Sequence, residues 1–373
     1  MNLELSAEQD AMRATVRSFL ADHAGAEEHA RSAADPDHAG SSGIWRGLAD
    51  LGTTGLLVEE RLGGAGLTMV EAGMVLEELG AVLHPGPWTS CAVLSVRLLD
   101  QLLEPPAELY AGIADGTLIV TSALEAPGVS LDSHTGTTLS GELHHVPDAS
   151  TANLLLIPII AEQDFRVFAV EAEHRHLHTE RVPGIDHTRR RYHVKLDGVP
   201  GRDLGHIAAE SLAAVTDDVL IATAAEALGA ARAVLDETVA YTKVRHQFGQ
   251  PIGAFQAVQH LCVDMLETVE LIRSGVLHAL WASASGPSPE RHLAAARLKG
   301  MSGTLAEVGD TAIQVLGGIG YTWEHDAHLY LRRLLDWSSF LGRPTAYQRE
   351  IGAALIAEIL PHLAQPLGMG VTS

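Results

Sequence analysis

Apolar residues near the N-terminus recur every three or four positions, which is the spacing of one helix face. Ser6 precedes Gln9 by three positions, the pattern of a capping box, so a helix is expected over residues 7–23. The same spacing, with glycine stops, predicts further helical segments at residues 44–51, 69–80 and 89–115.

The pattern changes at Leu118, where short apolar runs replace the helical stripes. Glycine, proline and aspartate separate these runs, as expected of strands joined by turns. The predicted strands include residues 118–121, 139–143, 154–157, 166–170 and 192–196.

Helical spacing returns at Ala208 and predicts long helices over residues 211–243, 254–284, 288–316 and 323–360. The order is therefore helices, a β region, then helices. We predict a mostly α fold with a small β middle domain, divided into residues 1–115, 116–205 and 206–373.

Composition narrows the class of partner. The 373 residues include 25 Lys and Arg against 47 Asp and Glu, for a net charge of −22. Because nucleic-acid affinity rests largely on Lys and Arg that displace counterions, no nucleic-acid partner is expected. The 46% hydrophobic content is ample for a large core.

Cys91 and Cys262 are far apart and form no CxxC pattern, so neither a disulfide framework nor a zinc site is indicated. The N-terminus lacks a basic segment followed by an apolar one, and no run of about 18 apolar residues occurs. We expect a cytoplasmic protein without a membrane span.

Histidine is common, with 20 residues. His174, His176 and His178 alternate and would share one strand face, but no cysteine or carboxylate completes a ligand set, so no metal is expected. Residues 186–191, which include three consecutive arginines, are expected to form an exposed positive loop.

Two glycine-containing motifs suggest a dinucleotide. In the first, Arg245-His-Gln-Phe248-Gly, a guanidinium offers a planar fork to pyrophosphate and the ring can pack on an adenine or flavin face. In the second, Gln314-Val-Leu-Gly317-Gly318, a helix ends in adjacent glycines, so a cofactor can approach the backbone closely. The alternative is that these residues form interhelix packing and a helix cap.

Together with Leu62-Gly-Gly-Ala-Gly-Leu67 and Leu76-Glu-Glu-Leu-Gly80, these motifs resemble the flavin-dependent acyl-CoA dehydrogenase family over nearly the whole chain. The resemblance implies a helical N-terminal domain, a β-barrel-like middle domain and a C-terminal four-helix bundle that forms dimers and tetramers. It also implies FAD-dependent oxidation of the Cα–Cβ bond of an acyl-CoA thioester, with an electron-transfer flavoprotein as acceptor.

In the family a carboxylate removes the α proton while the β hydrogen leaves as hydride. The resemblance also implies that this chain contacts an FAD that is bound mainly by a neighbouring subunit. The residues that it assigns to this contact are Arg245, Phe248, Gln256, Gln314, Gly317 and Gly318.

The sequence departs from the family in the middle domain. The stretch after Thr121 lacks the family's Gly-Ser-Asp loop, and His145 falls where an aromatic residue that contacts flavin is expected. The Ser or Thr expected beyond His145 is also missing. The flavin-binding surface of this chain is therefore expected to be incomplete.

The catalytic carboxylate is missing as well. Counting along the motifs puts its two family positions at Leu334 and Val219, neither of which can take a proton. Asp218 is one residue from the second position and is the candidate base, although one residue rotates a side chain by about 100° around a helix. Alternatively, Asp217 and Asp218 are acidic residues in the early turns of a helix, where they interact favourably with the helix dipole.

Three hypotheses follow. The chain resembles actinobacterial heteromeric dehydrogenases that act on steroid side chains, in which an unlike partner supplies the base and most of the flavin site, as a heterotetramer. Alternatively, it is a homomeric enzyme that uses Asp218 or another carboxylate. The third hypothesis is a non-catalytic scaffold or regulatory homologue.

Overall fold

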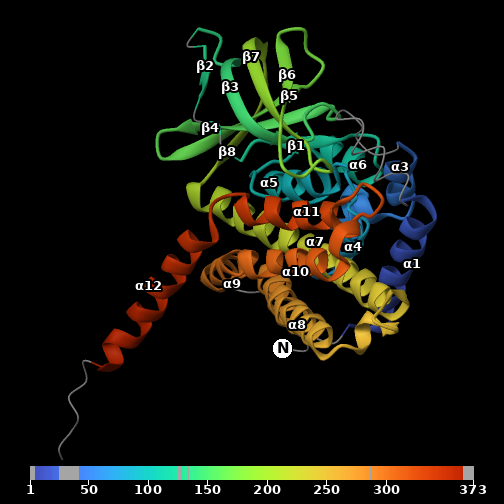
Figure 1. The fold of residues 1–373 in the computed structure, drawn as a ribbon. Helices are drawn as coiled ribbons and strands as arrows, with labels where there is room; N and C mark the ends of the chain where they lie inside the picture. Colours follow the sequence, from blue (N-terminus) through green and yellow to red (C-terminus); the bar gives the residue numbers. More distant parts are fainter. Residues whose placement is uncertain are drawn as a thin grey trace, which may run out of the picture.

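The computed structural model describes residues 5–24 and 42–363, apart from residues 125, 127, 133, 286 and 287. It consists of an N-terminal helical region, a domain of two sheets, and a C-terminal bundle of long helices (Figure 1). The predicted fold class, mostly α with a small β middle domain, is confirmed. Within the described residues, no helix is both long and apolar enough to cross a bilayer.

The N-terminal region begins with the predicted capping box, in which the Gln9 amide donates to Ser6 Oγ and the Ser6 amide to Gln9 Oε1.

The segment expected to be helical throughout residues 89–115 is interrupted before Ala107, at two prolines that cannot donate a backbone hydrogen bond. The helices are α1 (Ala7–His23), α3 (Ser42–Asp50), α4 (Met69–Ala81), α5 (Val96–Leu99) and α6 (Ala107–Ala114), with short turns η1 (Thr53–Gly55) and η2 (Glu60–Leu62) and a π-helical segment η3 (Thr89–Ser95).

The middle domain stacks two four-stranded sheets, with strand orders β1-β4-β5-β8 and β2-β3-β7-β6 (Figure 1). Apolar side chains such as Leu139, Phe168 and Val194 fill the space between them. The strands are β1 (Val120–Ser122), β2 (Val129–Leu131), β3 (Thr138–Pro147), β4 (Leu154–Ala161), β5 (Asp164–Glu171), β6 (Leu177–Val182), β7 (Arg191–Pro200) and β8 (Arg202–Ile207).

The C-terminal region is a bundle in which α7 contacts α8, α9, α10 and α11. Its elements are α7 (Ala209–Val244), the hairpin β9 (His246–Gln247) and β10 (Gln250–Pro251), η4 (Ile252–Ala254), α8 (Gln256–Ser285), α9 (Ser288–Gly300), α10 (Ser302–Leu316), η5 (Gly317–Tyr321), α11 (Ala327–Ser339) and α12 (Pro344–Leu363).

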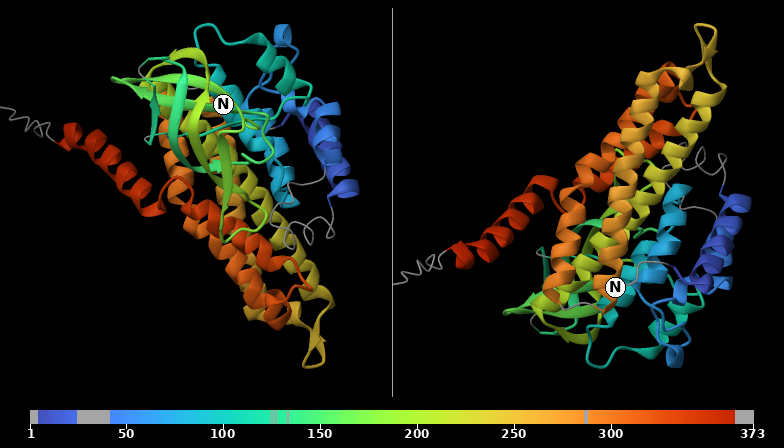
Figure 2. Two further views of the ribbon diagram at one scale, coloured as in Figure 1. Left: turned by 90° about the horizontal axis from the view of Figure 1, so that it is seen from above. Right: turned by 90° about the horizontal axis from the view of Figure 1, so that it is seen from below.

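Two of the predicted long helices are in fact pairs. The helix expected over 288–316 breaks at Met301, and the one expected over 323–360 breaks where Leu341 and Gly342 adopt positive φ angles of 53° and 110°. The second break lets α12 leave the bundle, and both views in Figure 2 show it projecting from the body of the protein.

Helices α4 and α7 cross at backbone contact, because each has a glycine at the crossing. A Cβ on Gly80 would lie 1.9 Å from the Glu226 carbonyl oxygen, and one on Gly229 would lie 1.8 Å from that of Glu77. These distances are far below van der Waals contact, so only glycine permits this approach.

Next to this crossing, two buried carboxylates of α4 hold four elements together. Glu78 accepts hydrogen bonds from Arg13 and Arg17 of α1 and from Arg232 of α7, at 2.8 to 3.2 Å. Glu77 contacts Arg273 of α8. Burial by itself would raise the pKa of Glu78, but hydrogen bonds from Arg17 and Arg13 outweigh it and lower the pKa to about 2.

We expect Gly80→Ala to destabilise the protein by about 1–3 kcal/mol or more, because the two helix backbones must move apart. Thermal unfolding measures this as a lower Tm. Gly352→Ala is the matched control: a Cβ there meets nothing within 4 Å, so it should leave the Tm unchanged or raise it slightly. Equal Tm values for Gly80→Ala and wild type would contradict the backbone contact.

We also expect a pH-dependent contribution from Glu78. Its folded pKa, about 2, lies below its ordinary value of 4.5, so its stabilisation is complete above pH 4.5 and is lost as the pH falls toward 2. The Tm deficit of Glu78→Gln should therefore be large at pH 7 and shrink below about pH 4.5. Glu59→Gln, which disrupts an exposed pair with Arg61, should show little deficit at either pH. A deficit for Glu78→Gln that is independent of pH would refute this role.

Candidate active site

A cavity of about 660 Å³ lies where the N-terminal helices, the sheet domain and the bundle meet. Thr89 and Ser90 of η3 form one wall and residues of β3 another. The remaining walls come from α7 and from the end of α11 with the turn that follows it. It is large enough for a drug-sized ligand and lies between domains, where binding sites commonly occur.

The α7 wall is a single helix face. Thr216, Val219, Thr223, Glu226 and Ala227 line the cavity, and their spacing of three, seven, ten and eleven residues places them along one side. Except for Glu226, this wall carries no charge.

The α11 wall includes the break before α12. Asp336, Trp337 and Phe340 line the cavity, followed by Leu341 and Gly342 in the turn. Tyr347 supports this turn by donating a 2.6 Å hydrogen bond from Oη to the Leu341 carbonyl.

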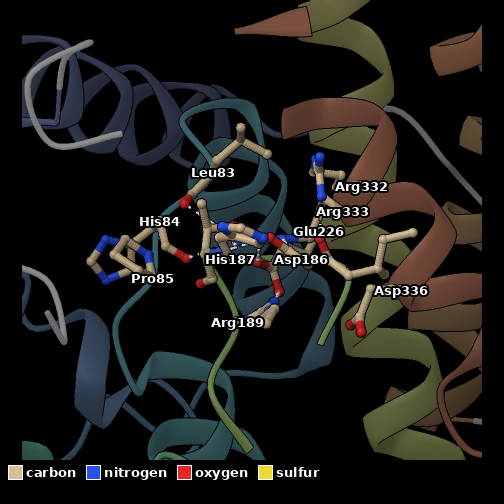
Figure 3. A network of polar contacts seen from close by, with 12 residues as sticks. Leu83, His84, Pro85, Asp186, His187, Arg189, Glu226, Arg332, Arg333 and Asp336 are labelled. Atoms are coloured by element: carbon tan, nitrogen blue, oxygen red, sulfur yellow. Dashed lines mark hydrogen bonds and ion pairs between the residues drawn. The ribbon is translucent and has the colours of Figure 1, made fainter. Parts of the chain in front are cut away.

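The Arg333 guanidinium is the centre of a buried polar network beside the cavity (Figure 3). It pairs with Asp186 at 2.5 Å and with Glu226, and it donates to Thr188 Oγ1 at 2.6 Å. Burial would raise the pKa of Asp186, but Arg333 and hydrogen bonds from Thr188 lower it. The loop that was expected to be exposed is therefore buried in part: Asp186, Thr188 and Arg190 are at most 2% exposed.

Two more arginines of this segment contact carboxylates in the cavity wall. Arg189 pairs with Glu226, and burial together with the charge of Arg333 lowers the pKa of Arg189 to about 9. Arg191 pairs with both oxygens of Asp336, at 2.7 and 2.6 Å. Neither carboxylate was predicted, because the only signal for them in the sequence is the run of arginines that neutralises them.

The candidate base positions do not meet in the cavity. Val219 lines it, whereas Leu334 is fully buried in the core and does not. Asp218 is also absent from the cavity wall in the described part of the chain. Its carboxylate lies 3.2 Å from Arg97 and accepts a 2.6 Å hydrogen bond from Ser283, so it faces other helices. Burial raises the pKa of Asp218, and Arg97 opposes that shift.

The sheet domain contributes His144, His145 and Pro147 to the cavity. His145 has a φ of 56°, which is rare for a residue other than glycine. Pro147, two residues beyond His145, has no hydroxyl or amide hydrogen to donate.

The residues assigned to FAD by resemblance lie elsewhere. Arg245 caps the end of α7 and Phe248 lies in the β9–β10 hairpin that follows, which both views in Figure 2 place at the end of the bundle remote from the sheet domain. Phe248 is 92% exposed, and Arg245 and Gln256 are also exposed.

Gln314, Gly317 and Gly318 are exposed at the end of α10. Gly317 has a φ of 65°, and a Cβ on either glycine would meet nothing within 4 Å. This open backbone fits the close approach of a cofactor. None of the six residues lines the described cavity, and all six are exposed.

Comparisons with known proteins agree with this architecture. The N-terminal domain of acyl-CoA dehydrogenases matches residues 6–99, and the C-terminal domain of acyl-CoA dehydrogenases matches residues 221–355. Acyl-CoA dehydrogenase FadE34 of Mycobacterium tuberculosis is 33% identical over 96% of this chain, which spans 50% of FadE34. Acyl-CoA dehydrogenase IpdE2 of Mycolicibacterium smegmatis is 31% identical over 94% of this chain and 99% of its own length.

Solved structures are similar over 95% of this chain. A variant of the Tcur3481-Tcur3483 steroid ACAD matches with 29% identity, a TM-score of 0.83 and 99% of its own chain covered. The ChsE4-ChsE5 complex from Mycobacterium tuberculosis matches in fold, with 24% identity, a TM-score of 0.86 and 99% of its chain covered. On the two domain matches and the full-length similarity to IpdE2, the chain belongs to the acyl-CoA dehydrogenase family.

Proposed function

We propose that this chain is one subunit of a heteromeric, FAD-dependent acyl-CoA dehydrogenase that introduces an α,β double bond into an acyl-CoA thioester. An unlike subunit supplies the catalytic base and most of the FAD-binding surface. The observation that carries this proposal is the cavity wall: Val219, one of the two positions that the resemblance assigns to the base, lines it, and each described carboxylate in this wall is engaged by another side chain.

Three carboxylates line the cavity in the described part of the chain, and each is already engaged. Glu226 pairs with Arg333 and Arg189, and Asp336 pairs with Arg191. Asp148 accepts a 2.6 Å hydrogen bond from Ser90, and burial raises its pKa.

A general base must reach the proton that it removes and must be unprotonated. Glu226 and Asp336 would have to break charged pairs first. Asp148 would have to release its hydrogen bond from Ser90. Because all three carboxylates are engaged by other side chains, they support a catalytic base that comes from the partner subunit.

The exposed residues of the β9–β10 hairpin and of the end of α10 support a contribution of this chain to an FAD site that is built mainly by its partner. The Arg245 guanidinium would donate charge-assisted hydrogen bonds to pyrophosphate, and the Phe248 ring would pack on an aromatic face. Gly317 and Gly318 would admit the cofactor close to the backbone, with Gln256 and Gln314 as polar contacts. FAD, when bound, supplies the hydride acceptor.

An exposed apolar face on α8 supports assembly with another subunit. Val263, Leu266 and Leu271 are 58%, 49% and 56% exposed and lie within about 140° around the helix axis. Apolar residues grouped in this way are typical of a protein interface.

We propose a bulky acyl group, such as a steroid side chain, as the substrate class. Its support is the 29% identity to a steroid ACAD over nearly the whole chain. We also propose an electron-transfer flavoprotein as the electron acceptor and a cytoplasmic, heterotetrameric enzyme.

Co-expression tests the subunit proposal. The chain is purified alone and together with the acyl-CoA dehydrogenase encoded by an adjacent gene, and flavin absorbance is recorded before and after addition of a steroid side-chain CoA ester. We expect yellow protein that bleaches with substrate only after co-expression. A yellow, active chain on its own would overturn the proposal, and colourless protein in both preparations would favour a non-catalytic homologue.

Arg245→Ala should weaken FAD binding by the co-expressed complex by roughly 10- to 100-fold, because a charge-assisted hydrogen bond contributes about 1.5–3 kcal/mol. FAD content after dialysis and the FAD dissociation constant measure this effect. Arg175→Ala removes an exposed arginine in the sheet domain and should leave both unchanged. Unaltered FAD affinity in Arg245→Ala would remove this residue from the FAD site.

Asp218→Asn tests the homomeric alternative. Since Asp218 faces Arg97 and Ser283, we expect the complex to keep its flavin and its rate of reduction while unfolding at a lower temperature. Loss of flavin reduction with the flavin retained would instead identify Asp218 as the base.

A further inference from the structure

The outer face of the β2-β3-β7-β6 sheet brings three potential metal ligands together. Glu142 and His144 are two residues apart on β3, so they point to the same side. His193 lies on β7, the strand that pairs with β3 (Figure 1). In the described part of the chain, these three residues form the one group of at least three ligand-type side chains whose donor atoms all lie within 4.8 Å of one another.

A β-bulge creates this convergence. Leu143 pairs with Val194, and the next pair is Val146 with Tyr192, so two residues of β3 lie opposite His193 alone. The extra residue is His145, whose φ of 56° absorbs the irregularity. Bulges of this kind redirect side chains and are frequent next to functional sites.

One pair of donor atoms already has the separation that a metal ion requires. His193 Nε2 lies 3.3 Å from Glu142 Oε2. A tetrahedral ion with bonds of about 2.0–2.2 Å places its ligand atoms about 3.3–3.6 Å apart. The His144 and His193 rings are stacked, with centroids 4.6 Å apart and planes 10° apart, and a metal ion would require the imidazoles to rotate from this arrangement.

His193 Nε2 is shielded from solvent and makes no hydrogen bond of good geometry among the described residues, although Glu142 Oε2 lies 3.3 Å from it. A shielded polar atom without a partner is costly. The contact with Glu142 meets this need only in part, whereas a bound cation would be coordinated by both side chains.

We propose that Glu142, His144 and His193 bind a divalent transition-metal ion such as Zn²⁺, with a water in the remaining position. Two imidazoles and one carboxylate are a recognised zinc ligand set and favour transition metals over Ca²⁺ or Mg²⁺. Two charged residues neighbour the site. Glu180 of β6 pairs with His193, and Lys195 of β7 pairs with Glu142, so one negative and one positive charge flank the proposed ligands.

The site adjoins the cavity, because His144 lines it together with His145. A bound ion would fix the bulge and so hold this wall in place. The proposal does not depend on FAD binding or on a partner subunit.

The test uses the full chain, purified without a polyhistidine tag and treated with a chelator that is then removed. Zn²⁺ is titrated by calorimetry, and Co²⁺ by the visible absorption of a four-coordinate site. We expect one saturable equivalent. His193→Gln and Glu142→Gln should each weaken binding at least tenfold, in line with the loss of one of three ligands.

His206→Gln is the matched control, since it changes an exposed strand histidine of the other sheet. It should leave the titration unchanged. Circular dichroism checks that each variant is folded, and His144→Gln provides a second ligand-removing histidine variant. The absence of a saturable equivalent, or equal affinity in wild type, His193→Gln and Glu142→Gln, would overturn the proposal.

Discussion

The arrangement of the domains depends on one buried cation. Arg333 is 2% exposed and contacts Asp186 and Thr188 of the sheet domain, Glu226 of α7 and the carbonyl of Leu83 after α4. A buried charge is strongly unfavourable without such partners. These three segments and α11, which carries Arg333, must therefore all be in place before this arginine is satisfied, which fixes the position of the cavity between them.

The same network determines what the cavity can do. Its arginines neutralise Glu226 and Asp336, so these carboxylates hold the walls together and are not available to a substrate proton. In contrast, the β9–β10 hairpin and the end of α10 expose an arginine, an aromatic ring and open glycine backbone. The charged groups of the cavity wall are therefore paired within the chain, whereas the exposed groups are available to bind another molecule.

Local signals predicted much of the fold. The capping box at Ser6 and the helical stripe of α7 appear almost at the expected residues, because both depend on neighbours within a few positions. The breaks at Met301 and Leu341 were not predicted, since the apolar spacing continues across them. Strands β6 and β8 were also missed, because neither presents an uninterrupted apolar run.

The motifs of the sequence by themselves determined the family, the kind of cofactor and the absence of a carboxylate at Val219, because these follow from residue identity along the chain. Only the tertiary structure decided which charged side chains are neutralised by ion pairs. Arg333 and Asp186 are 147 residues apart, and His193 meets Glu142 only through one strand pairing and its bulge. Such contacts depend on register and burial, which no local pattern encodes.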